Sequence, residues 1–248
     1  MLVLLPPSET KRDGGALDRL DLSSLSFAGL KTRRAELVRA VRLLARDADA
    51  TIAALKLGRT LGAVEVERNR RLTLSPTMPA LDRYTGVVFD ALSAESLPVA
   101  ARQFAGAHVA VHSALFGPIR VGDSIPAYRL SHDSRVPGLP LKKHWAAAAS
   151  AVLAREPGLL LDFRSEGYVA LGPVDARPNT HFLRVFSVGT DGKRRALNHF
   201  NKKAKGELTR ALVLAGVDFA SVDELLAWAP GAGFDLRLTP DGDLALMV

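Results

Sequence analysis

The chain has 248 residues, contains no cysteine and carries a formal net charge of +7. The missing thiols exclude disulfides, thiolate zinc sites and a cysteine nucleophile. No stretch approaches the roughly 18–20 apolar residues that a membrane span needs, and the first residues lack the form of a signal peptide. We therefore expect a cytoplasmic protein without a membrane partner. The excess of Lys and Arg suggests an anionic partner such as nucleic acid.

Apolar periodicity predicts an α/β fold, a single compact domain over residues 1–248 with a mixed sheet flanked by helices. In chain order, the predicted strands cover 1–5, 108–112, 159–163 and 181–188, followed by a terminal hairpin of 234–238 and 244–248. Predicted helices begin at residue 31 and then cover 51–57, 65–72, 94–104, 142–153 and 195–215. Asp191 and Gly192 are predicted to form a hairpin turn. The terminal hairpin is antiparallel, which is why we expect a mixed sheet.

The predicted helix 195–215 carries a basic face opposite its apolar stripe. At 100° per residue this face holds Arg195, His199, Lys202, Lys203 and Arg210, with Lys205 on its flank. Gly206 leaves room for the close approach of a phosphate or of another backbone. Because few acids interrupt these cations, we favour anion binding over a merely solvated face.

Residues 52–71 form a second basic segment, in which two predicted helices flank a turn with Gly58 and Gly62. This pattern is compatible with a helix-hairpin-helix element, whose backbone N–H groups hold a DNA phosphate, with Lys56 and Arg59 as further contacts. An ordinary turn between helices is the commoner alternative. The helix that begins at residue 31 also aligns three arginines on one face, namely Arg39, Arg42 and Arg46. Acids near that face favour a solvated surface there.

Polar residues follow the first predicted strand directly. Pro6 and Pro7 break the apolar run, and the polar segment Ser8–Lys11 comes next. Strands 1–5 and 159–163 are the most continuously apolar runs, so both are predicted to lie centrally in the sheet. Polar residues after such strands emerge where parallel α/β sheets bind ligands. We therefore expect one anion-binding site built from Ser8–Lys11, Tyr128-Arg129, Arg164-Ser165 and either Lys202 or Lys203; the alternative is that Ser8 and Thr10 only cap a turn.

Several blocks in a fixed order give the chain a family resemblance. They are Pro6–Lys11, Tyr84–Gly86, Ser113–Arg120, Pro126–Leu130, Asp162–Tyr168 and Lys202–Gly206. In this set the chain resembles the YaaA family of peroxide-stress proteins. It departs from that pattern at Glu9, where the family has Lys, and at Ala114 and Phe116. The resemblance implies one compact α/β domain, duplex DNA binding through a positive cleft with a helix-hairpin-helix element, and a cellular link to peroxide resistance and lower free iron.

Two functions remain open from the sequence. The first is a DNA-binding protein of the peroxide stress response that binds double-stranded DNA without sequence specificity, through Lys56, Arg59, Arg195, Lys202, Lys203, Lys205 and Arg210. The second is an enzyme acting on a nucleotide, nucleobase or related small anion in a polar pocket at the strand ends. Its candidate residues are Ser8, Glu9, Lys11, Tyr128, Arg129, Arg164, Ser165, Tyr168 and Lys203. We expect no cofactor and no metal, because the histidines lack the spacing of metal ligands.

Overall fold

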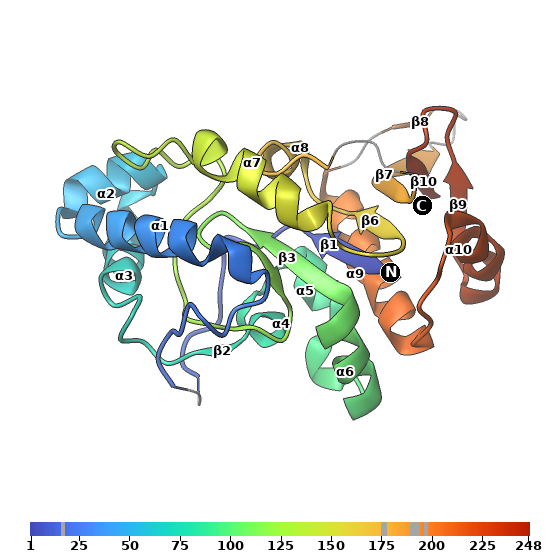
Figure 1. Cartoon of the computed structure of the whole chain (residues 1–248), viewed down its shortest axis with the longest axis horizontal. Helices are drawn as coiled ribbons and strands as arrows, with labels where there is room; N and C mark the ends of the chain where they lie inside the picture. The colour runs from blue at the N-terminus through green and yellow to red at the C-terminus, as the bar shows by residue number, and fades with distance from the viewer. Residues whose placement is uncertain (16–17, 175–177, 189–193, 196–197) are drawn as a thin grey trace.

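The fold is described from a computed structural model, for residues 1–15, 18–174, 178–188, 194–195 and 198–248 (Figure 1). Among these residues, eight strands form one mixed sheet in the order β4-β3-β1-β6-β7-β10-β9, with β8 paired to β7. The strands are β1 (Leu2–Leu5), β3 (Val109–Ser113), β4 (Gly117–Arg120), β6 (Leu160–Asp162), β7 (Thr180–Val188), β8 (Arg194–Arg195), β9 (Asp235–Leu238) and β10 (Leu244–Met247). The strands β2 (Met78–Pro79) and β5 (Ser124–Ile125) form a separate antiparallel pair.

The centre of the large sheet is parallel and its edges are antiparallel. β1 pairs in parallel with β3 on one side and β6 on the other, and β6–β7 and β7–β10 are also parallel. The edge pairs β3–β4 and β10–β9 are antiparallel. These arrangements confirm the predicted mixed sheet, the central positions of strands 1–5 and 159–163, and the terminal hairpin.

Helices lie on both faces of this sheet (Figure 1). The α-helices are α1 (Lys31–Leu44), α2 (Ala48–Leu55), α3 (Arg59–Arg70), α4 (Ala80–Arg83), α5 (Val87–Leu92), α6 (Val99–His108), α7 (Leu141–Leu153), α8 (Glu166–Val169), α9 (Asn198–Ala215) and α10 (Val222–Trp228). Short 3-10 helices cover Ala28–Leu30, Ala94–Ser96 and Ala229–Ala232. Leu2 and Leu4 of β1 pack with Leu153 of α7, whereas Val3 and Leu5 belong to the main core. The alternation of β1 therefore fills the layers above and below it.

Two predicted helices differ from the structure. The predicted helix 94–104 is a 3-10 turn followed by α6, because Pro98 lacks an N–H and disfavours helical geometry in the residue before it. Since α6 continues to His108, His108 and His112 do not share one strand face as expected. The predicted helix 195–215 begins only at Asn198, and Arg195 instead belongs to β8, which pairs with β7. Arg195 is therefore not on the basic face of that helix.

The two helices predicted around the basic turn at residues 52–71 correspond to α2 and α3. α2 and α3 are present, which confirms two helices here, but they are joined by Lys56–Gly58 alone. The helix predicted at 65–72 begins at Arg59, so Gly62 lies inside α3 and not in the turn. Their use as a DNA-binding helix-hairpin-helix remains a proposal. The predicted turn at Asp191-Gly192 lies outside the described residues. No helix of the described ranges is both long and apolar enough to span a bilayer.

The order of the strands creates a switch point at β1. From β1 the chain first builds β3 on one side and later β6 on the other. The connections therefore diverge at the carboxyl end of β1, which is where open parallel sheets bind their ligands. The residues after β1 and the carboxyl end of β3 meet in this region through Tyr128.

Candidate functional site

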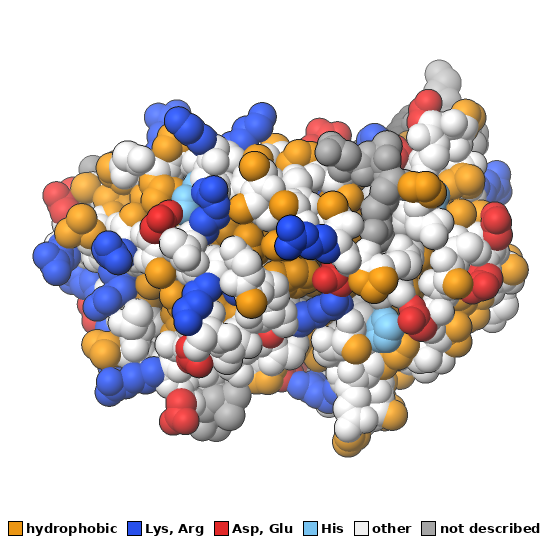
Figure 2. All heavy atoms as spheres, viewed as in Figure 1, with side chains coloured by type: hydrophobic (Ala, Val, Ile, Leu, Met, Phe, Trp, Pro, Cys, Tyr) orange, Lys and Arg blue, Asp and Glu red, His pale blue; other side chains and the backbone are white. Residues whose placement is uncertain are grey.

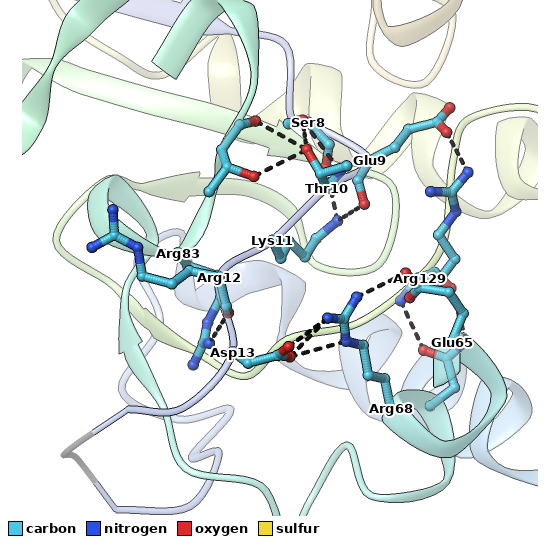
Figure 3. Close-up of polar contacts among 12 residues, drawn as sticks. Ser8, Glu9, Thr10, Lys11, Arg12, Asp13, Glu65, Arg68, Arg83 and Arg129 are labelled. Atoms are coloured by element: carbon cyan, nitrogen blue, oxygen red, sulfur yellow. Dashed lines mark hydrogen bonds and ion pairs between the residues drawn. The ribbon is translucent and has the colours of Figure 1, made fainter. Parts of the chain in front are cut away.

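The loop after β1 is tied to the Tyr84 segment by backbone contacts (Figure 3). Lys11 and Tyr84 form an isolated antiparallel bridge, and the Thr85 N–H donates to the Thr10 carbonyl at 3.3 Å. Gly86 has φ +96°, and a Cβ there would lie 3.0 Å from the Ser8 hydroxyl oxygen. A glycine is required because a side chain would be both strained and crowded at this position. These contacts bring two distant blocks of the sequence into one site.

Lys11 is buried at the centre of this site. Its side chain is 6% exposed, and its Nζ donates hydrogen bonds to the carbonyls of Ser8 at 2.8 Å and Glu9 at 3.2 Å. The same nitrogen lies 4.1 Å from the centroid of the Tyr128 ring. Burial away from water, with the positive charge of Arg129 as a second cause, lowers the pKa of Lys11 to about 7. A large part of Lys11 is therefore a neutral amine at physiological pH.

A chain of buried hydroxyls lies below Lys11. Ser113 Oγ accepts the backbone N–H groups of Leu115 and Phe116, both at 3.0 Å. Because both acceptor sites of this oxygen are filled, the Ser113 O–H donates to Tyr128 Oη at 2.7 Å. Buried Tyr128 then donates its proton to Tyr84 Oη, also at 2.7 Å. The chain of hydroxyls ends at Tyr84, which is only 3% exposed.

Charged side chains surround the loop (Figure 3). Arg129 pairs with Glu9, and Arg68 pairs with Asp13 at 2.8 Å and with Glu65 at 2.7 Å. Glu9 and Asp13 are mostly exposed, so their ion pairs contribute little and can be exchanged for another anion. Glu65 is buried, and its second oxygen, Oε2, has no hydrogen-bond partner among the described residues. Such a buried acceptor is costly unless a ligand or water satisfies it.

The residues after β6 form a separate internal network. The side chain of Arg164 is fully buried and pairs with Asp162 at 2.6 Å. It also donates to His112 Nδ1 at 2.7 Å and to the Gly172 carbonyl at 2.9 Å. Burial, reinforced by Arg164, lowers the pKa of His112 well below its usual value. Arg164 therefore holds the fold together instead of facing an open pocket.

Two other candidates near β6 have different environments. Ser165 is exposed and precedes α8 without capping it through its side chain. Tyr168 is buried and packs edge-on against His132, with ring centroids 5.1 Å apart. Burial, with the nearby Tyr128 as a second cause, raises the pKa of Tyr168. Tyr168 thus borders the hydroxyl chain, whereas Ser165 stands in solvent.

Helix α9 distributes its basic residues differently from the prediction. Lys202 and Lys203 are exposed, and Lys203 pairs with Glu207 at 3.2 Å. Lys205 is buried instead, with Nζ 3.4 Å from the Arg164 carbonyl, and burial lowers its pKa to about 8.

Gly206 and Arg210 of α9 both pack against α5. Arg210 donates to the carbonyls of Leu92 and Ser93, both at 2.9 Å, where α5 ends. A Cβ on Gly206 would lie only 2.2 Å from the Val88 carbonyl oxygen. The room beside Gly206 is therefore filled by the backbone of α5, which was one of the two predicted uses of this glycine.

The other predicted nucleic-acid contacts lie apart from this cluster. Lys56 occupies the turn between α2 and α3 and pairs with Asp133 at 2.6 Å. Hydrogen bonds from Lys56 and Ser131 lower the pKa of Asp133 to about 2. The side chains of Arg59 and Arg195 lie outside the described part of the structure.

The structure thus joins Ser8, Glu9, Lys11, Tyr128 and Arg129 in one site, with Tyr168 at its border. The site also contains four residues that were not among the sequence-predicted candidates, namely Glu65, Arg68, Tyr84 and Ser113. Tyr84 and Ser113 stand in two of the blocks that carried the family resemblance, which was a usable signal. Nothing in the local sequence marks Glu65.

Comparisons with known proteins agree with this architecture. The family model described as peroxide stress protein YaaA matches residues 1–237. The chain belongs to the YaaA family of peroxide stress proteins. A UPF0246 protein of Corynebacterium efficiens is 41% identical, covering 96% of this chain and 95% of its own. UPF0246 proteins of Corynebacterium glutamicum and Streptomyces coelicolor are each 39% identical, covering 97% and 96% of this chain and 96% and 92% of their own. Membership of this family supports a stress-related role.

Proposed function

We propose that this YaaA-family protein binds duplex DNA without sequence specificity as part of its role in peroxide stress. The main support is the charge of residues 28–71, which contain eleven Lys and Arg but five Asp and Glu. Figure 2 displays Lys and Arg side chains over the end of the molecule formed by α1–α3. This segment accounts for most of the net charge of +7.

Helix α1 supplies an exposed set of cations, which we name the α1 basic face. It consists of Lys31, Arg39 and Arg42 of α1 together with Arg46 in the turn after it, all of them exposed. None of the four forms an ion pair with another described residue. Arg39 and Arg42 lie three residues apart on one side of α1, and Arg46 follows in the turn after the helix. Unpaired cations in such a row fit the phosphates of a duplex better than they fit a self-neutralised surface.

Further contacts would come from the turn between α2 and α3 and from the start of α9. Lys56 stands in that turn, and Gly58 precedes the first residue of α3. In this proposal the turn acts as the helix-hairpin-helix, with N–H groups of α3 directed at a phosphate. Lys202 and Lys203 would contact the backbone of the same duplex from α9.

Titration of a labelled duplex at several salt concentrations tests this proposal. With four to six phosphate contacts, the logarithm of the binding constant should fall against the logarithm of salt with a slope of roughly −4 to −5. Arg39→Glu combined with Arg42→Glu should weaken binding about 10- to 100-fold at fixed salt.

The matched control combines Arg155→Glu with Arg237→Glu, which changes the net charge equally without altering Arg39 or Arg42. This control should bind the duplex within about threefold of the parent. Equal loss in both double variants would mean that only net charge matters. A flat salt response, or no binding at low salt, would contradict duplex binding itself.

A second function is favoured by one specific observation at the β1 switch point. Lys11 is a buried amine with a pKa of about 7, and it lies over the hydroxyl chain that ends in Tyr84. A lysine in this state can act as a base or a nucleophile. We therefore also propose an enzyme site for a small anion or a nucleic-acid group, with Lys11 as its reactive residue.

A further inference from the structure

The contacts of Lys11 satisfy both N–H groups of a neutral amine. Two backbone carbonyls, those of Ser8 and Glu9, accept hydrogen bonds from Nζ. A neutral amine has two N–H groups, which these carbonyls satisfy, and its lone pair remains available. No carboxylate of a described residue lies within ion-pair distance of Lys11. Nζ also lies 5.3 Å from the centroid of the Tyr84 ring, at the end of the hydroxyl chain.

We propose that Lys11 is an amine nucleophile that forms an imine with an aldehyde carried next to a phosphate. The proposal deepens the second function above, and its DNA form also rests on duplex binding. Nearby residues account for both features of this ligand class. The amine of Lys11 reacts with a carbonyl carbon. Arg68 and Arg129 nearby bind an anion.

The anion would be held by the cations around the loop. Arg129 and Arg68 are partly buried, whereas their partners Glu9 and Asp13 are mostly exposed. An incoming phosphate can therefore displace an exposed carboxylate without leaving a buried charge unpaired. A shallow hollow of about 460 Å³ lies at the Asp13 end of the loop; Asp13, Arg68 and Arg71 line it, whereas Lys11 does not. This volume accommodates a phosphate-bearing group.

The reaction at Lys11 needs no oxidant or reductant. The lone pair of Nζ forms a bond with the carbonyl carbon, and the carbonyl π electrons move to oxygen. One proton passes from nitrogen to that oxygen, and the resulting hydroxyl leaves as water after taking a second proton from solvent. The balance is amine plus aldehyde plus one proton, giving an iminium ion plus water. The O–H of Tyr84 is the donor placed to assist the departing oxygen, because burial raises the pKa of this tyrosine and keeps it protonated.

Two kinds of ligand carry an aldehyde close to a phosphate. One is the ring-opened deoxyribose of an abasic site in duplex DNA, which carries an aldehyde between two phosphates. The other is a small sugar phosphate with a free aldehyde. In both ligands the carbonyl carbon lies within a few bonds of a phosphate. The same residues could therefore bind the phosphate and react with the aldehyde in either ligand.

Reductive trapping tests the proposal and separates the two sources. The protein is incubated with cyanoborohydride and either a duplex holding one abasic site or deoxyribose 5-phosphate. Hydride reduces the iminium to a stable secondary amine, and intact mass followed by peptide mapping locates it. We expect a single adduct on Lys11, and adduct yield at least about tenfold lower in Lys11→Met. Lys205→Met is the matched control, because Lys205 is also buried and has a lowered pKa; it should trap as the parent does.

The outcomes are distinguishable. Mapping the parent adduct needs no variant, so misfolding of Lys11→Met cannot hide the answer. An adduct on another lysine, or none with either aldehyde, overturns the inference. If the parent binds an intact duplex but traps nothing, the inference fails while DNA binding stands. If it traps deoxyribose 5-phosphate yet binds no duplex, the imine chemistry stands with a small sugar phosphate as its source, and the proposed DNA binding fails.

Discussion

The loop after β1 and helix α9 use lysine in opposite ways. The loop has one lysine, and the fold buries it among backbone carbonyls and tyrosine rings. α9 has three lysines within four residues, of which Lys202 and Lys203 stand in solvent. The buried one, Lys205, lies beside the β6 network. The position of a lysine relative to the strand ends is therefore a better guide to its reactivity than the number of charges around it in the sequence.

The two buried lysines also differ from each other. Burial is the main cause that lowers both pKa values, to about 7 for Lys11 and about 8 for Lys205. Beside Lys205, the carboxylate of Asp162 opposes this effect, whereas at Lys11 the guanidinium of Arg129 adds to it. Lys11 is thus the more readily deprotonated of the two.

The largest expected effect is the pH dependence that Lys11 gives to stability. Its pKa is lower in the folded chain than in the unfolded one, so between about pH 7 and 10.5 the unfolded chain binds more protons. The free energy of unfolding should therefore rise with pH in this window, by about 3 kcal/mol relative to Lys11→Met between pH 7 and 9.5. Urea denaturation of both proteins across this range measures the difference. A difference that stays constant with pH would show that Lys11 is charged in the folded state.

The next effect tests the packing role of α9. Gly206→Ala places a Cβ against the Val88 carbonyl and 2.7 Å from the Ala91 Cβ, so α9 must shift from α5. We expect a loss of about 2 kcal/mol in the free energy of unfolding, measured by chemical denaturation. Gly106→Ala in α6 is the control, because no heavy atom lies within 4 Å of its Cβ position. It should be neutral or stabilising by up to about 1 kcal/mol; equal behaviour of the two variants would refute tight packing at Gly206.

A smaller effect tests the hydroxyl chain. Tyr128→Phe removes the oxygen that accepts from Ser113 and donates to Tyr84, while the ring beneath Lys11 remains. The buried Ser113 hydroxyl then lacks an acceptor, and we expect a loss of about 1.5 kcal/mol in thermal or urea unfolding. An unchanged stability would mean that the hydroxyls are satisfied in another way.

The smallest effect concerns the exposed lysines of α9. Lys202→Ala combined with Lys203→Ala removes solvent-exposed charges and one i,i+4 pair with Glu207. The free energy of unfolding should change by no more than about 0.5 kcal/mol. If both lysines contact phosphates, the salt slope of duplex binding should fall by roughly 2. A large loss of stability would show that this face is structural.

Much of the fold was predictable because buried strands appear in the sequence as continuous apolar runs. The apolar runs 1–5 and 159–163 indicated central strands, and the polar residues after residue 5 indicated a site at the sheet edge. The helix predicted over 94–104 was wrong at Pro98, although a proline at that position favours the observed break. The burial of Arg164 was not predictable, because it depends on a contact with His112, which is 52 residues away in the sequence.

The state of Lys11 could not be read from its neighbours in sequence. Its hydrogen-bond acceptors are backbone carbonyls, which every residue possesses. The two rings beside Lys11 come from distant parts of the sequence. Tyr84 is held next to it by an antiparallel bridge, and Tyr128 lies in a separate loop. A pKa shift of this kind depends on burial, which the local pattern around residue 11 does not encode.

Direct titration of the Lys11 amine is the most decisive measurement. The side-chain nitrogen or Cε resonances of labelled lysines can be followed by NMR from pH 5 to 11, with the Lys11 signal assigned by its loss in Lys11→Arg. We expect Lys11 to titrate at about 7. A midpoint near the ordinary lysine value of about 10.4 would show a charged, merely structural residue and would contradict a reactive amine at this site.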